Sequence, residues 1–217
     1  MEHDRELRNF LVRSTSELNL PLTEEQIEQF MLYLAQLLQW NRTTNLTSIT
    51  DPYAVISKHF VDSLTALVAV DLSLGTVIID VGAGAGFPGI PLKIVRNDLQ
   101  LVLLEPVQKK CSFLHSIVGS LKLEKVSVFS GTLQQYMAQE HPLAADLIVV
   151  RALRFDEIEE QAFLGLKPSG KVVLYRTEKM ETRLQYTRFN VQSEKSFSLP
   201  KGHGTRVISI LSRSVPA

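Results

Sequence analysis

Apolar residues recur along this chain at two spacings, the first typical of helices and the second of strands. The N-terminal third follows the helical spacing. A capping box, in which Thr23 and Gln26 satisfy each other's backbone amides, predicts a helix from there to about Trp40. Asp51 followed by Pro52 is typical of a second helix start, and that helix is predicted to run to about residue 70.

From residue 76 onward, short apolar runs alternate with helical patterns. This order predicts a parallel sheet covered by helices on both faces. Strands are predicted at 76–80, 99–104, 126–129, 146–150, 171–175, 189–198 and 206–212. Helices are predicted between them at 88–96, 107–121, 132–139 and 155–166. The last two strands have no helical pattern between them, so we expect them to pair antiparallel. The segment 167–170 is predicted to be a turn before the fifth strand.

Together these elements predict an α/β fold, with a doubly wound, mostly parallel, seven-stranded Rossmann-like sheet and an N-terminal helical extension. We assign the extension to residues 1–72 and the sheet domain to residues 73–217. No repeat, low-complexity tract or flexible linker separates the two, so we expect the extension to pack on the sheet domain. A chain of 217 residues, 45% of them hydrophobic, can bury a sizeable core.

The composition of the chain indicates where the protein is located and which kinds of chemistry it excludes. No apolar stretch approaches the roughly twenty residues that span a bilayer, and the N-terminus is charged, so we expect a cytoplasmic protein without a membrane partner. The lone cysteine, Cys111, excludes an internal disulfide and is expected to pack inside a helix. Five scattered histidines offer no ligand pair at metal spacing, so we expect no metal. We also expect a monomer.

Charge is balanced overall but unevenly distributed. Residues 1–75 carry five Lys or Arg against ten Asp or Glu, and the remaining residues carry eighteen against thirteen. The basic C-terminal part weakly favours an anionic substrate. Because many nucleic-acid-binding proteins are strongly basic and this chain is neutral, charge alone does not indicate RNA binding.

One βαβ segment carries the pattern of a nucleoside site. The apolar run 77–79 ends in Asp80, and glycines follow at Gly82, Gly84, Gly86 and Gly89. Glycines permit positive φ and let a ligand lie against the main chain, while the amides that begin the next helix point at it. Glu105 ends the next apolar run, where an acidic side chain can bind ribose hydroxyls.

The identity of that nucleoside rests on Asp80. Residues 84–89 satisfy the G-x-G-x-x-G pattern of dinucleotide enzymes, so an NAD(P)-dependent oxidoreductase is an alternative. A carboxylate at the strand end would repel phosphates, however, and would suit a cationic group such as the sulfonium of S-adenosylmethionine. We therefore favour S-adenosylmethionine, with Glu105 on its ribose.

Other candidate residues follow the remaining strands. The loop that contains Phe87 follows the first strand, Leu133 and Gln134 follow the third, and Arg151 closes the fourth. In a doubly wound sheet these positions border the ligand. Arg151 is then expected to point toward the methyl acceptor, although a solvated strand-end charge is the alternative. For Glu105 the alternative is a structural salt bridge.

The N-terminal candidates are less distinctive on their own. His59 can be a base or a packed histidine, and Lys58 with Asp62 can be an ordinary surface pair on a helix. Asn41 and Asn45 would also pass as a polar loop between helices.

A resemblance to a known family adds to what the spacing of residues indicates. The chain closely resembles the bacterial small-subunit (16S) ribosomal RNA guanine-N7 methyltransferases, also called the glucose-inhibited division protein B family. The likeness spans residues 20 to about 175, and the segments around residues 103–110 and 151–152 also match. The blocks that carry it are QWNRTTNLTSITDP at 39–52, KHFVDSL at 58–64 and DVGAGAGFPGIPL at 80–92. The first two are highly specific, because many unrelated methyltransferases share the glycine loop but not these.

The resemblance implies a Rossmann-like class I methyltransferase that binds S-adenosylmethionine and methylates 16S ribosomal RNA, free or in the small subunit. It implies that Gly82, Phe87, Leu133–Gln134 and Arg151 contact the cofactor, with Arg151 also near the guanine. It further implies an RNA-facing wall formed by the N-terminal blocks, whose substrate-binding candidates are Asn41, Asn45, Lys58, His59, Asp62 and Ser63. Two positions depart from the family pattern: Gln134, where an acid is usual, and residues 176–177, where lysine and glycine are usual. The segment 201–206 is only loosely similar.

Guanine N7 has a free in-plane lone pair at neutral pH, so such an enzyme needs no general base and acts mainly by positioning. A methyltransferase with a small-molecule acceptor and a non-catalytic RNA-binding protein are further alternatives.

Overall fold

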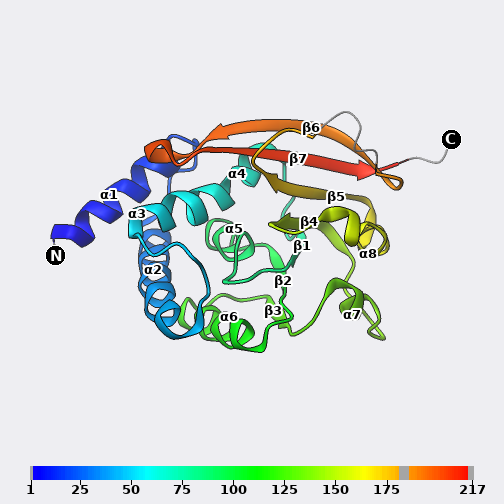
Figure 1. Cartoon of the computed structure of the whole chain (residues 1–217), viewed down its shortest axis with the longest axis horizontal. Coiled ribbons are helices and arrows are strands. Elements are labelled where there is room, and N and C mark those ends of the chain that lie inside the picture. The colour runs from blue at the N-terminus through cyan, green and yellow to red at the C-terminus, as the bar shows by residue number, and fades with distance from the viewer. Residues whose placement is uncertain (1, 181–185, 215–217) are drawn as a thin grey trace.

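The computed structural model describes residues 2–180 and 186–214 (Figure 1). Its centre is a seven-stranded sheet with the order β3-β2-β1-β4-β5-β7-β6. The first five strands run parallel, and β7 pairs antiparallel with both β5 and β6. The strands are β1 (Val77–Val81), β2 (Gln100–Leu104), β3 (Val126–Phe129), β4 (Ala145–Arg151), β5 (Leu166–Arg176), β6 (Phe189–Ser198) and β7 (Thr205–Arg213). The predicted fold class is confirmed, including the antiparallel final pair.

Helices cover both faces of this sheet. The α-helices are α1 (Glu2–Ser16), α2 (Glu24–Thr44), α3 (Pro52–Val55), α4 (Asp62–Ala69), α5 (Gly89–Val95), α6 (Gln108–Ser120), α7 (Leu133–Met137) and α8 (Glu159–Gly165). A π-helical segment, η1 (Ile56–Val61), joins α3 to α4, and two short 3₁₀ turns, η2 (Phe155–Glu157) and η3 (Pro200–Gly202), complete the described elements. In Figure 1, α1 to α6 lie on one side of the strands, and α7 and α8 lie on the other.

The two apolar cores follow from the alternation of side chains along each strand. Ile78 belongs to the core under α1 to α6, and its neighbour Ile79 belongs to the core under α7 and α8. The first core runs without a break from Leu7 and Leu11 of α1 to the sheet. The N-terminal helices therefore pack on the sheet, and the exact division at residue 72 stays a prediction.

Local sequence signals account for several element boundaries. Both sides of the predicted capping box at Thr23 and Gln26 are present, and the Asp51 side chain accepts from the Ala54 amide at 2.7 Å. Helix α1 was not among the sequence-based predictions. The predicted turn at 167–170 lies inside β5 as a bulge, because Ala145 pairs with Leu166 and Leu147 with Lys171.

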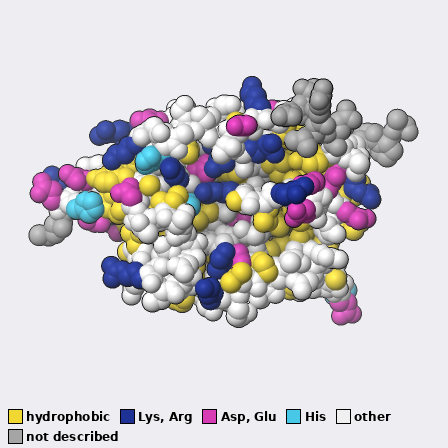
Figure 2. Space-filling model, in the orientation of Figure 1, with side chains coloured by type: hydrophobic (Ala, Val, Ile, Leu, Met, Phe, Trp, Pro, Cys, Tyr) yellow, Lys and Arg dark blue, Asp and Glu magenta, His cyan; other side chains and the backbone are white. Residues whose placement is uncertain are grey.

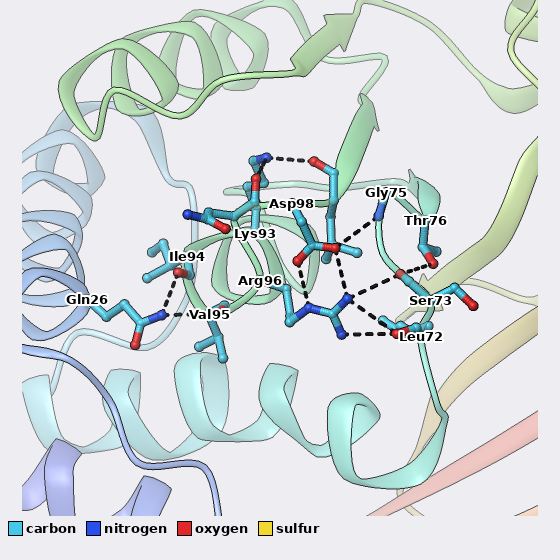
Figure 3. Close-up of polar contacts among 12 residues, drawn as sticks. Gln26, Leu72, Ser73, Gly75, Thr76, Lys93, Ile94, Val95, Arg96 and Asp98 are labelled. Atoms are coloured by element: carbon cyan, nitrogen blue, oxygen red, sulfur yellow. Dashed lines mark hydrogen bonds and ion pairs between the residues drawn. The ribbon is translucent and has the colours of Figure 1, made fainter.

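Polar contacts fasten the end of α5 to its surroundings (Figure 3). The Gln26 side chain of α2 donates to the last two carbonyls of α5, at 3.2 Å each, so those helix-end acceptors are satisfied. Arg96 donates to the carbonyls of residues 72–73 and pairs with Asp98 at 2.7 Å. Asp98 also accepts from the Gly75 amide at 3.0 Å, and the pKa of its carboxyl is lowered, chiefly by Arg96. These contacts fix the approach to β1, which leads into the site.

Phe113 of α6 tests whether the N-terminal helices and the sheet share one core. Its ring is fully buried and lies 5.6 Å from the Trp40 ring of α2, centre to centre. We expect Phe113→Ala to destabilise the protein by about 3–5 kcal/mol and to leave a single unfolding transition, measured by urea denaturation. Leu74→Ala, at a side chain that is 87% exposed, is the control and should change stability by less than about 0.5 kcal/mol. Two transitions, only one of them shifted, would contradict a shared core.

Candidate functional site

A cavity of about 560 Å³ opens at the carboxyl ends of β1, β2 and β4. This is the edge at which ligands bind in doubly wound sheets. The cavity draws on the glycine loop after β1, the end of β2, the segment before α7, the end of β4 and the loop between α2 and α3. Its polar or charged lining residues are Thr47, His59, Glu105, Lys110, Thr132 and Arg151. Its predicted glycine, aromatic and aliphatic lining residues are Gly82, Gly84, Phe87 and Leu133.

The glycines of the loop after β1 serve different purposes. Gly84 has φ +60°, and a Cβ placed on it would meet no protein atom closer than 3.9 Å. Its backbone therefore faces open cavity. A Cβ on Gly86 would instead collide with Ile90 and with the hydroxyl of Tyr33, which donates to the Ala85 carbonyl. Gly86 does not line the cavity, and its missing side chain lets α2 hold the loop.

Glu105 stands at the opposite wall, with only 3% of the residue exposed. One carboxylate oxygen accepts from the Gly84 amide at 2.8 Å, and the other accepts from the Val107 amide at 2.9 Å. Each oxygen can accept a second hydrogen bond, so the carboxylate is both fixed and available. Glu105 forms no salt bridge among the described residues, so the alternative of a structural salt bridge is not supported.

Asp80 does not line the cavity, which departs from the role expected of it. The strand extends one residue beyond the predicted end, to Val81, so Asp80 lies within β1 and its side chain faces the α5 layer. It is fully buried, and its Oδ2 accepts from the Gly89 amide at 2.7 Å. Burial raises the pKa of this carboxyl to about 7. Asp80 thus anchors the start of α5 beneath the loop.

Arg151 lines the cavity and is held by the helical segment that contains the KHFVDSL block. Its Nη2 donates to the Lys58 carbonyl at 2.8 Å and to His59 Nδ1 at 2.9 Å, and its Nη1 lies 3.4 Å from Asp62 Oδ2. Its guanidinium carbon also lies 5.9 Å from the centre of the Phe87 ring. The contacts show that Arg151 is no freely solvated strand-end charge, since only 15% of its side chain is exposed.

The π-helical segment makes the Lys58 carbonyl available to Arg151. The Asp62 amide donates to the Ser57 carbonyl, five residues back, and to the His59 carbonyl, instead of to Lys58 four residues back. The predicted helix over 51–70 therefore forms with this irregularity in its middle. Such π insertions are frequent at functional sites because they redirect backbone groups.

His59 is a packed, neutral histidine. Its ring stacks on Phe87 with centres 4.4 Å apart and an interplanar angle of 13°. A guanidinium can only donate, so Nδ1 accepts from Arg151 and the proton resides on Nε2, which lies 2.8 Å from Thr47 Oγ1. Burial, reinforced by Arg151, lowers the pKa of the imidazole to about 3.

Asp62 is fully buried and is no surface partner of Lys58. Both its oxygens accept from Arg206 of β7, at 2.5 and 2.9 Å. Ser63 is buried too: its hydroxyl donates to the His59 carbonyl, and its own carbonyl accepts from the Tyr175 hydroxyl at 2.6 Å. Asp62 and Ser63 thus hold Arg151 and His59, the two residues that form one wall of the cavity.

The remaining candidates lie at or outside the rim. Asn41 donates to the Thr47 carbonyl at 2.8 Å and accepts from the Thr47 amide at 2.9 Å, which clamps that residue. Asn45 is exposed at the end of α2, and Gln134 is exposed outside the cavity. The Lys58 side chain is half-buried.

Comparisons with known proteins agree with this geometry. Residues 26–208 match the family described as GidB, rRNA small subunit methyltransferase G. Ribosomal RNA small subunit methyltransferase G from Staphylococcus aureus (strain JH9) is 33% identical over 212 residues, covering 94% of this chain and 89% of the relative. The protein of that name from Staphylococcus carnosus (strain TM300) is also 33% identical, over 214 residues with the same coverage.

The chain belongs to the rRNA small subunit methyltransferase G family.

Solved structures resemble this family member in fold. A mutant of MtNAS in complex with S-adenosylmethionine aligns with a TM-score of 0.59 and 14% identity, covering 97% of this chain and 89% of that chain. TrmN from Thermus thermophilus aligns with a TM-score of 0.58 and 13% identity, covering 71% and 48%. Family membership confirms the predicted methyltransferase and excludes the oxidoreductase and the non-catalytic binder.

Three residues of this family member matter to the site but were not singled out in the sequence. Thr47 lies in the QWNRTTNLTSITDP block at 39–52, where its hydroxyl is an available signal. Tyr33 and Arg206 come from segments distant in sequence, and only the fold brings them to the loop and to Asp62. Over residues 2–180 and 186–214, no cluster of His, Cys, Asp or Glu is arranged to hold a metal, and no helix is long and apolar enough to cross a bilayer.

The pKa of His59 predicts how this wall responds to acid. In the unfolded chain His59 is protonated below about pH 6.5, but in the fold it stays neutral down to about pH 3. Protons then bind the unfolded state preferentially, so falling pH destabilises the wild type in that window. Relative to His59→Gln, we expect the wild type to lose about 2 kcal/mol of unfolding free energy between pH 6.5 and 5, measured with urea.

The exposed His115 provides the control for that experiment, since His115→Gln removes an imidazole away from the cavity. Parallel stability curves for the wild type and His59→Gln down to pH 4 would show that the histidine is charged in the fold.

Proposed function

We propose that the cavity is where this protein transfers a methyl group from S-adenosylmethionine to N7 of a guanine in 16S ribosomal RNA. Family membership carries the methyltransferase activity, the cofactor and the ribosomal RNA substrate. One observation supports the location: the bare backbone at Gly84 and the carboxylate of Glu105 share a single cavity with the Arg151–His59 wall.

The cofactor fits the first half of this cavity. Gly84 leaves room for a ligand against the main chain, and Glu105 keeps lone pairs for the two ribose hydroxyls. Leu104, Val107 and Leu133 supply apolar contacts for a purine ring. A cavity of about 560 Å³ falls within the usual range for small-molecule sites. Asp80 lies beneath the glycine loop and does not line the cavity, so we propose that it serves the cofactor indirectly, by holding the loop. Gln134 is exposed outside the cavity, and no contact supports a role for it in cofactor binding.

The acceptor half is the wall that contains Arg151 and His59. S-adenosylmethionine supplies an electrophilic methyl group on a sulfonium, which the N7 lone pair of guanine can take without a general base. The neutral imidazole of His59 adds no positive charge to this wall. The charge of Arg151 is offset in part by Asp62, which also pairs with Arg206. The stacked rings of His59 and Phe87 present π surface, which favours a purine that becomes cationic.

The substrate candidates divide into contact and support. We assign nucleotide contact to His59, which lines the cavity, and to Lys58 beside it, whereas Asn41, Asp62 and Ser63 would act through the residues that they hold. Asn45 is exposed at the rim, where it can meet RNA. Figure 2 shows Lys and Arg side chains spread over one face, with Asp and Glu side chains at both of its ends. We further propose that the protein acts as a monomer in the bacterial cytoplasm.

Gly84 offers a direct test of cofactor placement. Gly84→Ala adds a methyl group where only open cavity lies, so we expect S-adenosylhomocysteine to bind at least about tenfold more weakly by calorimetry. Gly75→Ala is a matched control because Gly75 has φ +71° and also no atom within 4 Å of the added carbon, but lies outside the cavity. Both variants should lose similar stability, and unchanged affinity in Gly84→Ala would remove the loop from the cofactor site.

Arg151 tests the acceptor wall. We expect Arg151→Ala to remain folded, because Asp62 keeps both hydrogen bonds from Arg206, and to lose at least about a hundredfold in methyl transfer. The assay follows radiolabelled methyl transfer to small subunits and to free 16S ribosomal RNA, with the modified guanine mapped by mass spectrometry. Arg154→Ala, at a side chain that is 73% exposed, is the control. Activity of Arg151→Ala within a few-fold of the wild type would exclude Arg151 from the site.

A further inference from the structure

Hydrogen bonds fix both the backbone and the side chain of Thr47, a residue in the loop between α2 and α3. Asn41 binds both its backbone amide and its carbonyl, at 2.9 and 2.8 Å. Its side-chain oxygen lies 2.8 Å from His59 Nε2 and accepts from the Ile49 amide at 3.1 Å. Thr47 also lines the cavity, on the side that contains His59 and Arg151. Both backbone and hydroxyl are therefore fixed before a substrate arrives.

The direction of the hydroxyl proton follows from its neighbours. Arg151 can only donate, so His59 carries its proton on Nε2 and donates it to Thr47. With the Ile49 amide, this donor occupies both lone pairs of the Thr47 oxygen. No acceptor for the hydroxyl proton lies within hydrogen-bond distance among the described residues. Since His59 has a pKa of about 3, the arrangement persists at neutral pH. Thr47 thus offers the cavity a donor and no acceptor.

Resting on the proposed function, we propose that the Thr47 hydroxyl donates to O6 of the target guanine and selects guanine over adenine. Guanine presents two acceptors side by side, N7 and O6, on the edge that reacts. The N7 lone pair must stay free to attack the methyl group. A hydroxyl that donates to this edge of guanine therefore has O6 as its acceptor. Adenine carries an amino group at that position, and two donors would then face each other. Thr47 is a specificity-determining residue on this assignment.

The test compares guanine with 2-aminopurine, which keeps N7 but lacks O6. Small-subunit RNA is assembled by ligation with either base at the one position that the wild-type protein methylates. Wild type, Thr47→Val and Thr47→Ser are assayed for kcat/KM on each RNA, and S-adenosylhomocysteine affinity and thermal unfolding are measured for all three. The serine variant keeps the hydroxyl, and the valine variant keeps the shape without it.

We expect the wild type to lose about tenfold on 2-aminopurine, the effect of one hydrogen bond, and Thr47→Val to show almost no difference between the two RNAs. Thr47→Ser should restore the discrimination, and cofactor affinity should be alike in all three proteins. If Thr47→Val discriminates as the wild type does, the inference is overturned. A selective loss of cofactor affinity in Thr47→Val would also overturn it, since the hydroxyl would then serve the cofactor. Absence of any guanine methylation by the wild type would instead refute the proposed function itself.

Discussion

A carboxylate with no exposed surface needs buried partners, and Asp62 has two arginines that are far from it in the sequence, one as a hydrogen-bond donor and both as ion-pair partners. Arg206 of β7 binds both its oxygens, and Arg151 at the end of β4 lies 3.4 Å away. Losing one partner of a buried ion pair leaves an uncompensated charge, which is costly, so the arrangement resists distortion. It ties a helix, a parallel strand and the antiparallel edge of the sheet together, and it sets the position of Arg151 independently of any ligand.

The hydrogen bonds of Arg151 in turn orient residues that line the cavity. The guanidinium donates to the Lys58 carbonyl, which the π-helical segment leaves available, and to Nδ1 of His59. That choice fixes the imidazole proton on Nε2 and so determines what Thr47 accepts. Phe87, stacked on the same imidazole, joins this wall to the glycine loop. A buried charge thereby orients groups that line the cavity.

Much of the fold could be predicted because it follows from local patterns. Apolar runs and capping residues predicted the sheet and most helices, and the predicted residues Gly82, Gly84 and Glu105 line one cavity. The acceptor wall could be predicted only in part. A helical pattern does not reveal a π insertion, and Arg206 lies 144 residues from Asp62, so nothing local connects them. Asp80 lies within β1, which extends one residue further than predicted, to Val81, and its side chain bonds the start of α5 instead of lining the cavity.

The charge balance of the wall bears on the reaction itself. Methyl transfer from a sulfonium to N7 moves positive charge onto the purine, so an uncompensated cation beside the acceptor would oppose it. Arg151 and Arg206 share the single negative charge of Asp62, and His59 is neutral. Asp62 therefore offsets part of the positive charge beside the proposed acceptor position, and the imidazole adds none. Arg151 can supply hydrogen-bond donors there with a weaker positive field than an unpaired arginine would produce.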